Sequence, residues 1–220
     1  GRLGTGNPRW SQPNIFKTSN IKMTLEELRV ITIVYVSALL PLILYFFYKE
    51  KIPLWIPKVY IGSFLLCALG WELWFTFGWI EGDPVNIRRS AVLNSWIPMN
   101  INWLLNSMAD AGTISLGGLW LMWQFSGKNL QIFQQWNWPA FSILLIWCIA
   151  QNLFVELFLY HDQLSEGKLL SWAPLAPTGQ FFNPQLFEIN DRSVMFQTQL
   201  PWLLMAPILY QLAILLAKKS

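Results

Sequence analysis

The run VITIVYVSALLPLILYFFY at residues 30–48 decides the fold class of this chain. It holds no charged side chain and has about the length, roughly 20 residues, that a helix needs to cross a bilayer. Thr24-Leu-Glu-Glu27 comes just before it and has the pattern of a capping box, which satisfies the free amides at a helix start. Pro41 is expected to bend the helix without ending it. The run therefore predicts a first membrane-spanning helix.

Four more runs of the same character follow along the chain. Only 12% of the residues are charged, about half of the roughly 25% found in soluble domains, and 54% are hydrophobic. The 14 Trp and 6 Tyr agree with this, since their amphipathic rings favour the bilayer interface. We therefore predict an all-α protein, a polytopic integral membrane helical bundle of about five transmembrane helices. The spans are expected at residues 30–48, 59–80, 98–124, 139–160 and 200–217.

The segments outside the membrane are unevenly distributed along the chain. Residues 1–23 are polar, contain Gly and Pro, and show no periodicity, so they are predicted to form an extramembrane N-terminal tail. Residues 24–220 are predicted to form the transmembrane bundle. Within it, residues 161–199 are too polar and too often interrupted by Pro to span, so they are predicted to form an extramembrane loop.

The distribution of lysines predicts an orientation. Five spans place the two termini on opposite sides, with the large loops on the side of the N-terminal tail. Short loops count most in the positive-inside rule. We therefore expect the short-loop side and the C-terminus to be cytoplasmic, with the tail and residues 161–199 opposite. The lysines of the short-loop side are Lys49, Lys51, Lys58, Lys128, Lys218 and Lys219.

Three carboxylates fall inside predicted spans: Glu72, Asp110 and Glu156. A carboxylate at mid-bilayer costs about 3 kcal/mol on insertion scales, so such residues tend to face a protein interior or a cavity. Asp110 lies deepest in its predicted span. These three residues are our candidate catalytic groups.

Polar side chains recur with helical spacing around these carboxylates and predict a shared pocket. Residues four apart lie on one face of a helix. At about 1.5 Å of rise per residue, Glu72, Asn106 and Asn152 each lie roughly 12 Å from the large-loop end of their predicted spans. The alternative is that these side chains only hold the bundle together through interhelical hydrogen bonds. The three stripes are Asn102, Asn106 and Asp110; Asn152, Glu156 and Tyr160; and Glu72 with Thr76.

Two adjacent arginines, Arg88 and Arg89, follow the second predicted span. Guanidinium groups beside a membrane surface favour a phosphate or carboxylate headgroup, although an ordinary interfacial charge pair has the same pattern. His161, the only histidine, ends the fourth predicted span, where a cation stabilises the helix end; a proton-transfer role is the alternative.

The sequence identifies no cofactor. Carboxylates and amides suit hard ions such as Ca²⁺ or Mg²⁺, but a single histidine excludes a multi-histidine site, and no metal is predicted. The net charge of +3 is scattered, without a basic stripe, so nucleic acid is not an expected partner. The expected partners are membrane lipids and other membrane protein subunits.

Three functions remain open from the sequence. The first is a membrane-embedded enzyme or a binding protein for a lipid or isoprenoid-like molecule, because a carboxyl group kept neutral in an apolar pocket can act as a general acid. The second is a non-catalytic subunit of a larger membrane complex, for which an apolar helix at residues 30–48 and an aromatic loop are suited. The third is a transporter for a small solute, although five spans without a visible repeat are few for one.

Overall fold

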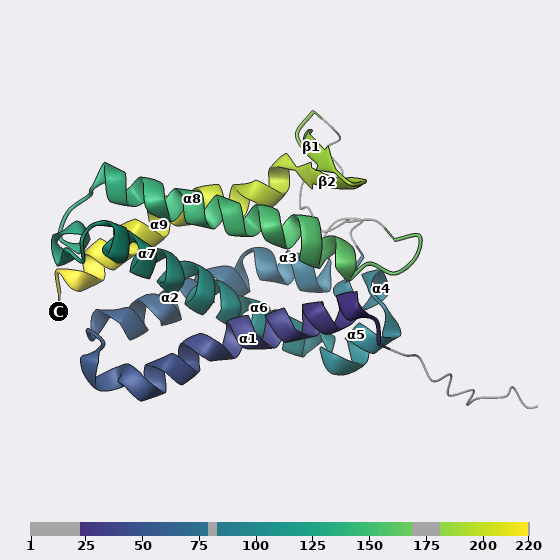
Figure 1. Ribbon diagram of the computed structural model, residues 1–220, viewed down its shortest axis with the longest axis horizontal. Helices are drawn as coiled ribbons and strands as arrows, with labels where there is room; N and C mark the ends of the chain where they lie inside the picture. Colours follow the sequence, from purple (N-terminus) through teal and green to yellow (C-terminus); the bar gives the residue numbers. More distant parts are fainter. Residues whose placement is uncertain (1–22, 79–82, 169–180, 220) are drawn as a thin grey trace, which may run out of the picture.

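The computed structural model describes residues 23–78, 83–168 and 181–219. Within these ranges the chain is mostly helical, and one two-stranded hairpin accompanies the helices (Figure 1). The tail predicted at residues 1–23 lies outside the described residues, apart from Met23. The helical elements are α1 (Leu25–Tyr48), η1 (Lys49–Lys51), α2 (Trp55–Leu69), α3 (Trp71–Phe77), α4 (Val85–Arg88), α5 (Ala91–Trp96), α6 (Met99–Ala109), η2 (Asp110–Leu116), α7 (Gly117–Phe125), η3 (Leu130–Phe133), α8 (Trp138–Phe154), η4 (Val155–Tyr160) and α9 (Phe196–Ala217).

By length and composition, three helical runs are able to cross a membrane: Leu25–Lys51, Trp138–Tyr160 and Phe196–Ala217. The pair α2 and α3 meets the same criterion when taken together, although the two helices are bent by 45°. The predicted span at residues 98–124 is not among these runs. It forms a continuous helix from α6 through η2 to α7, and the polar residues that it carries, including Asp110, lower its hydropathy.

The helix predicted at residues 59–80 is broken at Gly70, which separates α2 from α3. A Cβ atom at Gly70 would lie 2.6 Å from the Leu66 carbonyl oxygen, so a larger residue would force the backbone to shift. Beside the break, the Trp103 indole donates a hydrogen bond to the Ala68 carbonyl at 2.8 Å. A neighbouring helix thus pairs a backbone group next to the break, as an interrupted helix in lipid requires.

Two segments, η2 and η4, are π-helical and continue α6 and α8 without a break. Such segments are rare and often lie at functional sites. Asp110 is the first residue of η2, and Glu156 is the second residue of η4. Each π-helical segment therefore begins at or next to one of the carboxylates singled out by the sequence.

The capping box predicted at Thr24 is confirmed, and Pro41 lies inside α1 without ending it. Proline lacks an amide proton, so the carbonyl four residues earlier, that of Ser37, loses its partner within the helix. The Thr113 hydroxyl of η2 donates to this carbonyl at 2.7 Å. Close to it, a Cβ atom on Gly112 would lie 2.6 Å from the Pro41 ring. The proline of α1 and the glycine of η2 therefore fix these two elements against each other.

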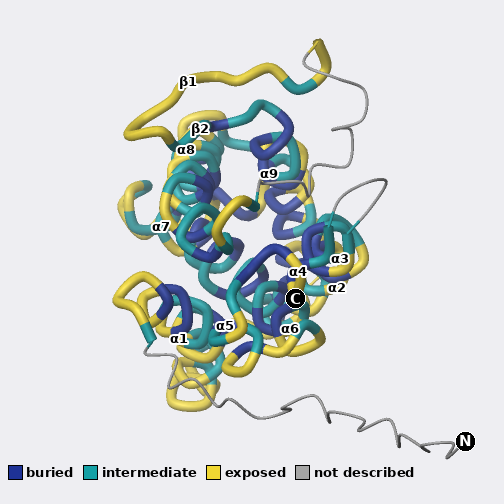
Figure 2. Tube along the Cα trace, turned by 90° about the vertical axis from the view of Figure 1, so that its right-hand side faces the viewer, coloured by how far each residue is buried: buried dark blue, intermediate teal, exposed yellow. Residues whose placement is uncertain are grey.

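The apolar interior has two parts. One is formed mainly by α2, α7, α8 and α9, with Leu144 and Leu209 fully buried. The other joins α1 to α5 and α6, with Leu93 and Ile97 fully buried. Figure 2 shows the buried sides of the helices facing inwards, while the outer sides are exposed. Many exposed residues of α1 are large and apolar, as expected for a helix that faces lipid.

A β-hairpin corrects the all-α prediction. Strands β1 (Gln185–Ile189) and β2 (Arg192–Met195) pair antiparallel within the predicted loop at residues 161–199. Asn190 and Asp191 connect them with φ of 51° and 60°, the conformation that a two-residue hairpin turn requires. The chain then enters α9 directly, so the last helix begins at Phe196, before the predicted start at residue 200.

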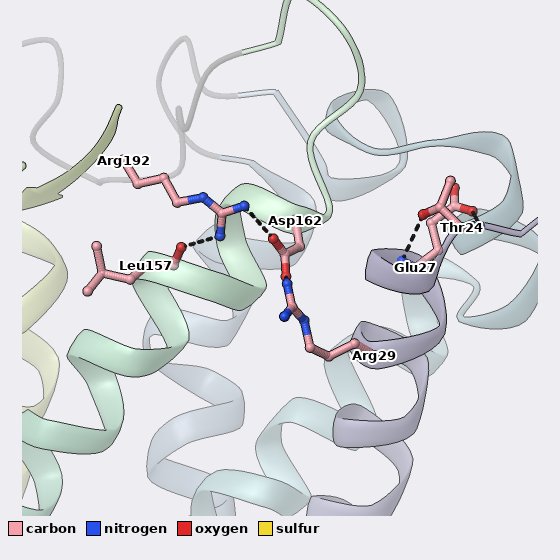
Figure 3. Close-up of polar contacts among 6 residues, drawn as sticks. All are labelled: Thr24, Glu27, Arg29, Leu157, Asp162 and Arg192. Atoms are coloured by element: carbon pink, nitrogen blue, oxygen red, sulfur yellow. Dashed lines mark hydrogen bonds and ion pairs between the residues drawn. The ribbon is translucent and has the colours of Figure 1, made fainter. Parts of the chain in front are cut away.

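Asp162 lies just after η4 and joins three parts of the chain (Figure 3). Its carboxylate accepts a hydrogen bond from Arg192 of β2 at 2.7 Å and another from Arg29 of α1. The preceding His161 ring contacts the Ser193 carbonyl at 3.3 Å, with the ring N–H as the donor. The hairpin is thereby held over the end of η4.

The two ends of the bundle differ. The first residues of α1 lie with α4 and α5 at one end, and the C-terminus lies at the other (Figure 1). This other end also contains η1, the start of α2 and the connection from α7 to α8. The start of α1 and the C-terminus of the described chain therefore lie at opposite ends of the bundle.

Candidate functional site

A cavity of about 240 Å³ lies between α1, α3, the α6–η2 helix and the α8–η4 helix. Its lining is mostly apolar, but several polar side chains converge on it. This combination is typical of sites that bind small molecules. The sequence-predicted residues that line the cavity are Glu72, Asn102, Asn106, Asp110 and Tyr160.

Asp110 lies at the junction of α6 and η2, on the cavity wall. Its Oδ2 atom accepts a hydrogen bond from the Trp71 indole at 2.8 Å. Trp71 in turn packs against Trp202 of α9, with ring centroids 5.4 Å apart. The carboxyl group is therefore held by one neutral donor and remains only partly buried, with a face towards the cavity.

Glu72 lies in the first turn of α3, just after the break at Gly70. Only 4% of the residue is exposed, and its Oε2 atom has no hydrogen-bond partner among the described residues. The Asn106 amide interacts with the same carboxyl group, and Asp110 lies within electrostatic range of it. Buried polar atoms normally have partners, so an unpaired carboxyl oxygen on a cavity wall marks a position where a bound molecule would form a hydrogen bond.

Arg88 places a positive charge beside Glu72. It is 1% exposed, and its guanidinium lies over the Phe75 ring, 4.7 Å from the centroid. It donates to the Phe75 carbonyl, interacts electrostatically with Glu72 and Tyr160, and leaves its Nε atom without a partner among the described residues. Burial lowers the pKa of Arg88 to about 10, which still leaves the group protonated at neutral pH. The interior thus contains a cation close to Glu72.

Arg89 bonds inside the protein, away from any headgroup. It is 3% exposed and donates to Asn94 at 2.8 Å, to Asn102 at 2.8 Å and to the Ile97 carbonyl. Burial lowers the pKa of Arg89 to about 10. Asn102 also donates to the Thr76 hydroxyl at 3.3 Å, which places Thr76 behind the cavity wall. Neither Arg88 nor Arg89 therefore exposes a guanidinium group that could make the predicted contact with a headgroup.

Glu156 does not line the cavity but holds the start of α9. Its carboxylate accepts hydrogen bonds from the Met195 amide at 2.9 Å, the Thr198 hydroxyl at 2.7 Å and the Gln199 amide at 2.6 Å. Asn152, one turn earlier, donates to the Thr198 carbonyl at 2.7 Å and to Gln199 at 2.9 Å. The geometry gives both residues a structural role, which is the alternative that the sequence left open.

The π-helical hydrogen bonding of η4 explains why one predicted stripe is divided. In an α-helix, Asn152, Glu156 and Tyr160 would share a face, but the i→i+5 pairing of η4 rotates the later residues relative to the earlier ones. Tyr160 consequently lines the cavity, together with Gln151 from α8. Gln151 was missed because an α-helical count places it beside the stripe and not on it.

Two acids in one cavity can donate and accept a proton. A carboxyl group in its neutral form donates, and a carboxylate accepts, so Asp110 and Glu72 supply the two roles that general acid–base catalysis needs. In the described part of the chain, no three residues among His, Cys, Asp and Glu come together as metal ligands.

Comparison of the chain with protein-family models, with curated proteins and with solved structures finds no match.

Proposed function

We propose that this chain is an integral membrane protein that binds a lipid-soluble molecule in the cavity between α1, α3, α6–η2 and α8–η4. The observation that carries the proposal is Glu72, a buried residue that lines this cavity and whose Oε2 atom has no hydrogen-bond partner among the described residues. A buried carboxyl oxygen without a hydrogen-bond partner destabilises the folded protein by about 1–3 kcal/mol. A bound molecule would remove that cost.

The proposed topology has five spans. They are α1, the bent pair α2–α3, the helix from α6 to α7, the helix from α8 to η4, and α9. The third of these is the most polar, because it contributes Asn102, Asn106 and Asp110 to the cavity. A span whose polar side faces the protein interior does not need to be apolar all round. We further propose that the end with the lysine-rich short connections is cytoplasmic.

The size of the cavity limits what enters it. Ligand pockets usually measure roughly 300–1,000 Å³, so a cavity of about 240 Å³ suits the polar end of an amphiphile better than a whole lipid. Val34 of α1 and Phe154 of α8 line it from opposite sides, and Phe154 is 46% exposed. We propose that the polar end enters between α1 and α8 while the apolar chain stays in the bilayer.

A catalytic role for the cavity is part of the proposal. If Asp110 is neutral and Glu72 is ionised, Asp110 can protonate one carbon of a double bond while Glu72 removes a proton from the allylic carbon attached to the other end of that double bond. The double bond moves by one position, and the protons balance. Isoprenoid- or sterol-like molecules, which carry such bonds and dissolve in the bilayer, are the class of substrate that this pair suits.

Native mass spectrometry of the protein, extracted from its own membrane in mild detergent, tests the proposal. We expect one chain or a small homo-oligomer carrying a lipid-like adduct. The adduct should be lost in Glu72→Gln and Asp110→Asn and retained in Glu50→Gln, whose side chain is exposed in η1. A preparation without any adduct, or one that all three variants retain equally, would contradict binding in this cavity.

A second function, as a non-catalytic subunit of a membrane complex, is favoured by the outer side of α1. This helix exposes large apolar residues along its second half, among them Phe46 and Phe47, and only a small share of it is buried. Another membrane protein could cover that side as well as lipid does. In the same mass spectrum, a fixed stoichiometry with other chains and an empty cavity would favour this second function over the first.

A further inference from the structure

The charges around the cavity do not balance. Glu72 and Asp110 line it, and Arg88 is the cation that faces Glu72. With both acids ionised, the sum is one negative charge. A neutral ligand therefore leaves the site either with one uncompensated charge or with one acid protonated.

Groups further from the cavity leave this sum unchanged. Glu156 bonds only neutral donors of α9, and Arg89 bonds only neutral acceptors, so these two buried charges offset each other. Asp83, which interacts with Arg88, is paired with Lys168 at 3.1 Å. With both acids ionised, the site is therefore one positive charge short of neutrality among the described residues.

The hydrogen-bonding groups of the two acids are also unbalanced, because they include acceptors that lack donors. Within the described ranges, Glu72 Oε2 accepts no hydrogen bond, and Asp110 accepts one from Trp71. The cavity therefore offers acceptors at two points and requires donors from its ligand. An alkylammonium group has donors and a positive charge together, whereas an alcohol has a donor without the charge.

Four aromatic residues are part of the cavity lining, beside aliphatic ones. Phe75, Trp147, Phe154 and Tyr160 come from α3, α8 and η4 and surround the acids. The faces of such rings attract cations, and the attraction is largest where water is excluded. Acids and aromatic rings together are the surroundings that stabilise a buried ammonium group.

From these observations, we infer that the molecule bound in the cavity is a singly charged cationic amphiphile, with an aliphatic amine seated between Glu72 and Asp110 and a single apolar chain leaving between α1 and α8. This inference rests on the proposed function, because it names the chemical class of ligand for the same cavity. The volume of about 240 Å³ suits a small amine with its first methylene groups.

The test compares matched probes on the whole protein in nanodiscs of zwitterionic phosphatidylcholine, which carry no net charge to attract an amine. 1-Dodecylamine and 1-dodecanol have the same chain and differ in their polar end. Each is added at equal mole fraction of lipid, and thermal unfolding is followed by circular dichroism, since a ligand of the folded state raises Tm. We expect the amine to bind at least ~10-fold more tightly than the alcohol.

Variants place the effect in the cavity. Removing one partner of a buried charge pair costs roughly 2 kcal/mol or more, so Glu72→Gln or Asp110→Asn should weaken amine binding by about 30-fold or more. Glu50→Gln, at the opposite end of the bundle, should respond like the wild-type protein. If one cavity variant does not fold, the other variant and the comparison of the two probes on wild-type protein decide the question.

The outcomes separate the two proposals. If the alcohol binds as tightly as the amine, or the cavity variants bind the amine like wild type, the inference of a cationic ligand is overturned and the proposed function survives. If neither probe shifts Tm and no lipid-like adduct accompanies the purified protein, the proposed function fails as well.

Discussion

The segments η2 and η4 invite a comparison, because each is π-helical and each carries a carboxylate at its start. In η2, Asp110 accepts one hydrogen bond and faces a cavity. In η4, Glu156 accepts three hydrogen bonds from the start of α9 and is not among the residues that line this cavity. The same sequence signal, a carboxylate one turn after an asparagine on an apolar helix, thus marks a candidate binding group in one place and a structural one in the other. The number of donors supplied by the protein makes the difference.

Removal of the Glu156 carboxylate should have the largest effect on stability. In Glu156→Ala, the amide of Met195, the hydroxyl of Thr198 and the amide of Gln199 lose their shared acceptor. Unsatisfied buried donors cost about 1–3 kcal/mol each, so we expect a loss of about 3 kcal/mol or more in the free energy of unfolding. Reversible unfolding of the detergent-solubilised protein measures it. A loss below about 1 kcal/mol would contradict a structural role for Glu156, and with it the difference between η4 and η2.

The packing of η2 against α1 gives the next largest effect. An added methyl group in Gly112→Ala would press on the Pro41 ring, and overpacking of this kind costs about 1–3 kcal/mol. Gly117→Ala is the matched control, because its Cβ atom would lie 3.9 Å from Trp147, an ordinary contact. There the better helix propensity of alanine should leave stability equal or higher by up to about 1 kcal/mol. Equal losses in both variants would contradict a specific role for the contact between residue 112 and Pro41.

The hydrogen bond from Thr113 to the Ser37 carbonyl predicts a smaller, coupled effect. Thr113→Val should cost about 1 kcal/mol in the wild-type background, in line with hydrogen bonds between membrane helices. In Pro41→Ala, the new amide at residue 41 can pair with the same carbonyl, so the cost of Thr113→Val should fall. A double-mutant cycle on unfolding free energies measures this coupling. Additive losses, without coupling, would contradict the claim that Thr113 pairs with the Ser37 carbonyl because Pro41 cannot.

The smallest effect on unfolding is expected for Asp110→Asn. The amide oxygen of asparagine can still accept the Trp71 hydrogen bond, so the free energy of unfolding should change by less than about 1 kcal/mol. Circular dichroism and the unfolding titration used for Glu156→Ala check this. A loss as large as that of Glu156→Ala would assign Asp110 a structural role and equate the two segments.

Part of this architecture can be predicted from the sequence. The capping box at Thr24, the continuity of α1 through Pro41, and the shared face of Asn102, Asn106 and Asp110 follow from local rules of helix geometry, and the structure has all three. The α6 stripe stays intact because it precedes η2, so that α-helical spacing still applies along its length.

Other features depend on contacts that a single sequence does not display. The break at Gly70 and the π-helical phase of η4 arise where helices meet. The α-helical count therefore groups Tyr160, which lines the cavity, with Asn152 and Glu156, which do not, and it overlooks Gln151. The surface role assigned to Arg88 failed for a related reason. Its burial depends on Phe75, Glu72 and Tyr160, which come from other elements. Sequence alone does not show these contacts, and two adjacent arginines are normally expected at the surface. The hairpin was missed because its turn, Asn190-Asp191, lacks the glycine that usually marks one.

The hydrogen bond between Thr113 and Ser37 also has a consequence for biogenesis. The two residues are 76 positions apart, so at translation rates of roughly 5–20 residues per second, the ribosome needs about 4–15 s to make the second after the first. During that interval, α1 has a bare carbonyl group beside Pro41 in its middle, with no neighbouring helix to cover it. A nascent chain arrested before residue 113 should therefore remain next to the insertion machinery, and release of α1 into lipid should coincide with the arrival of η2.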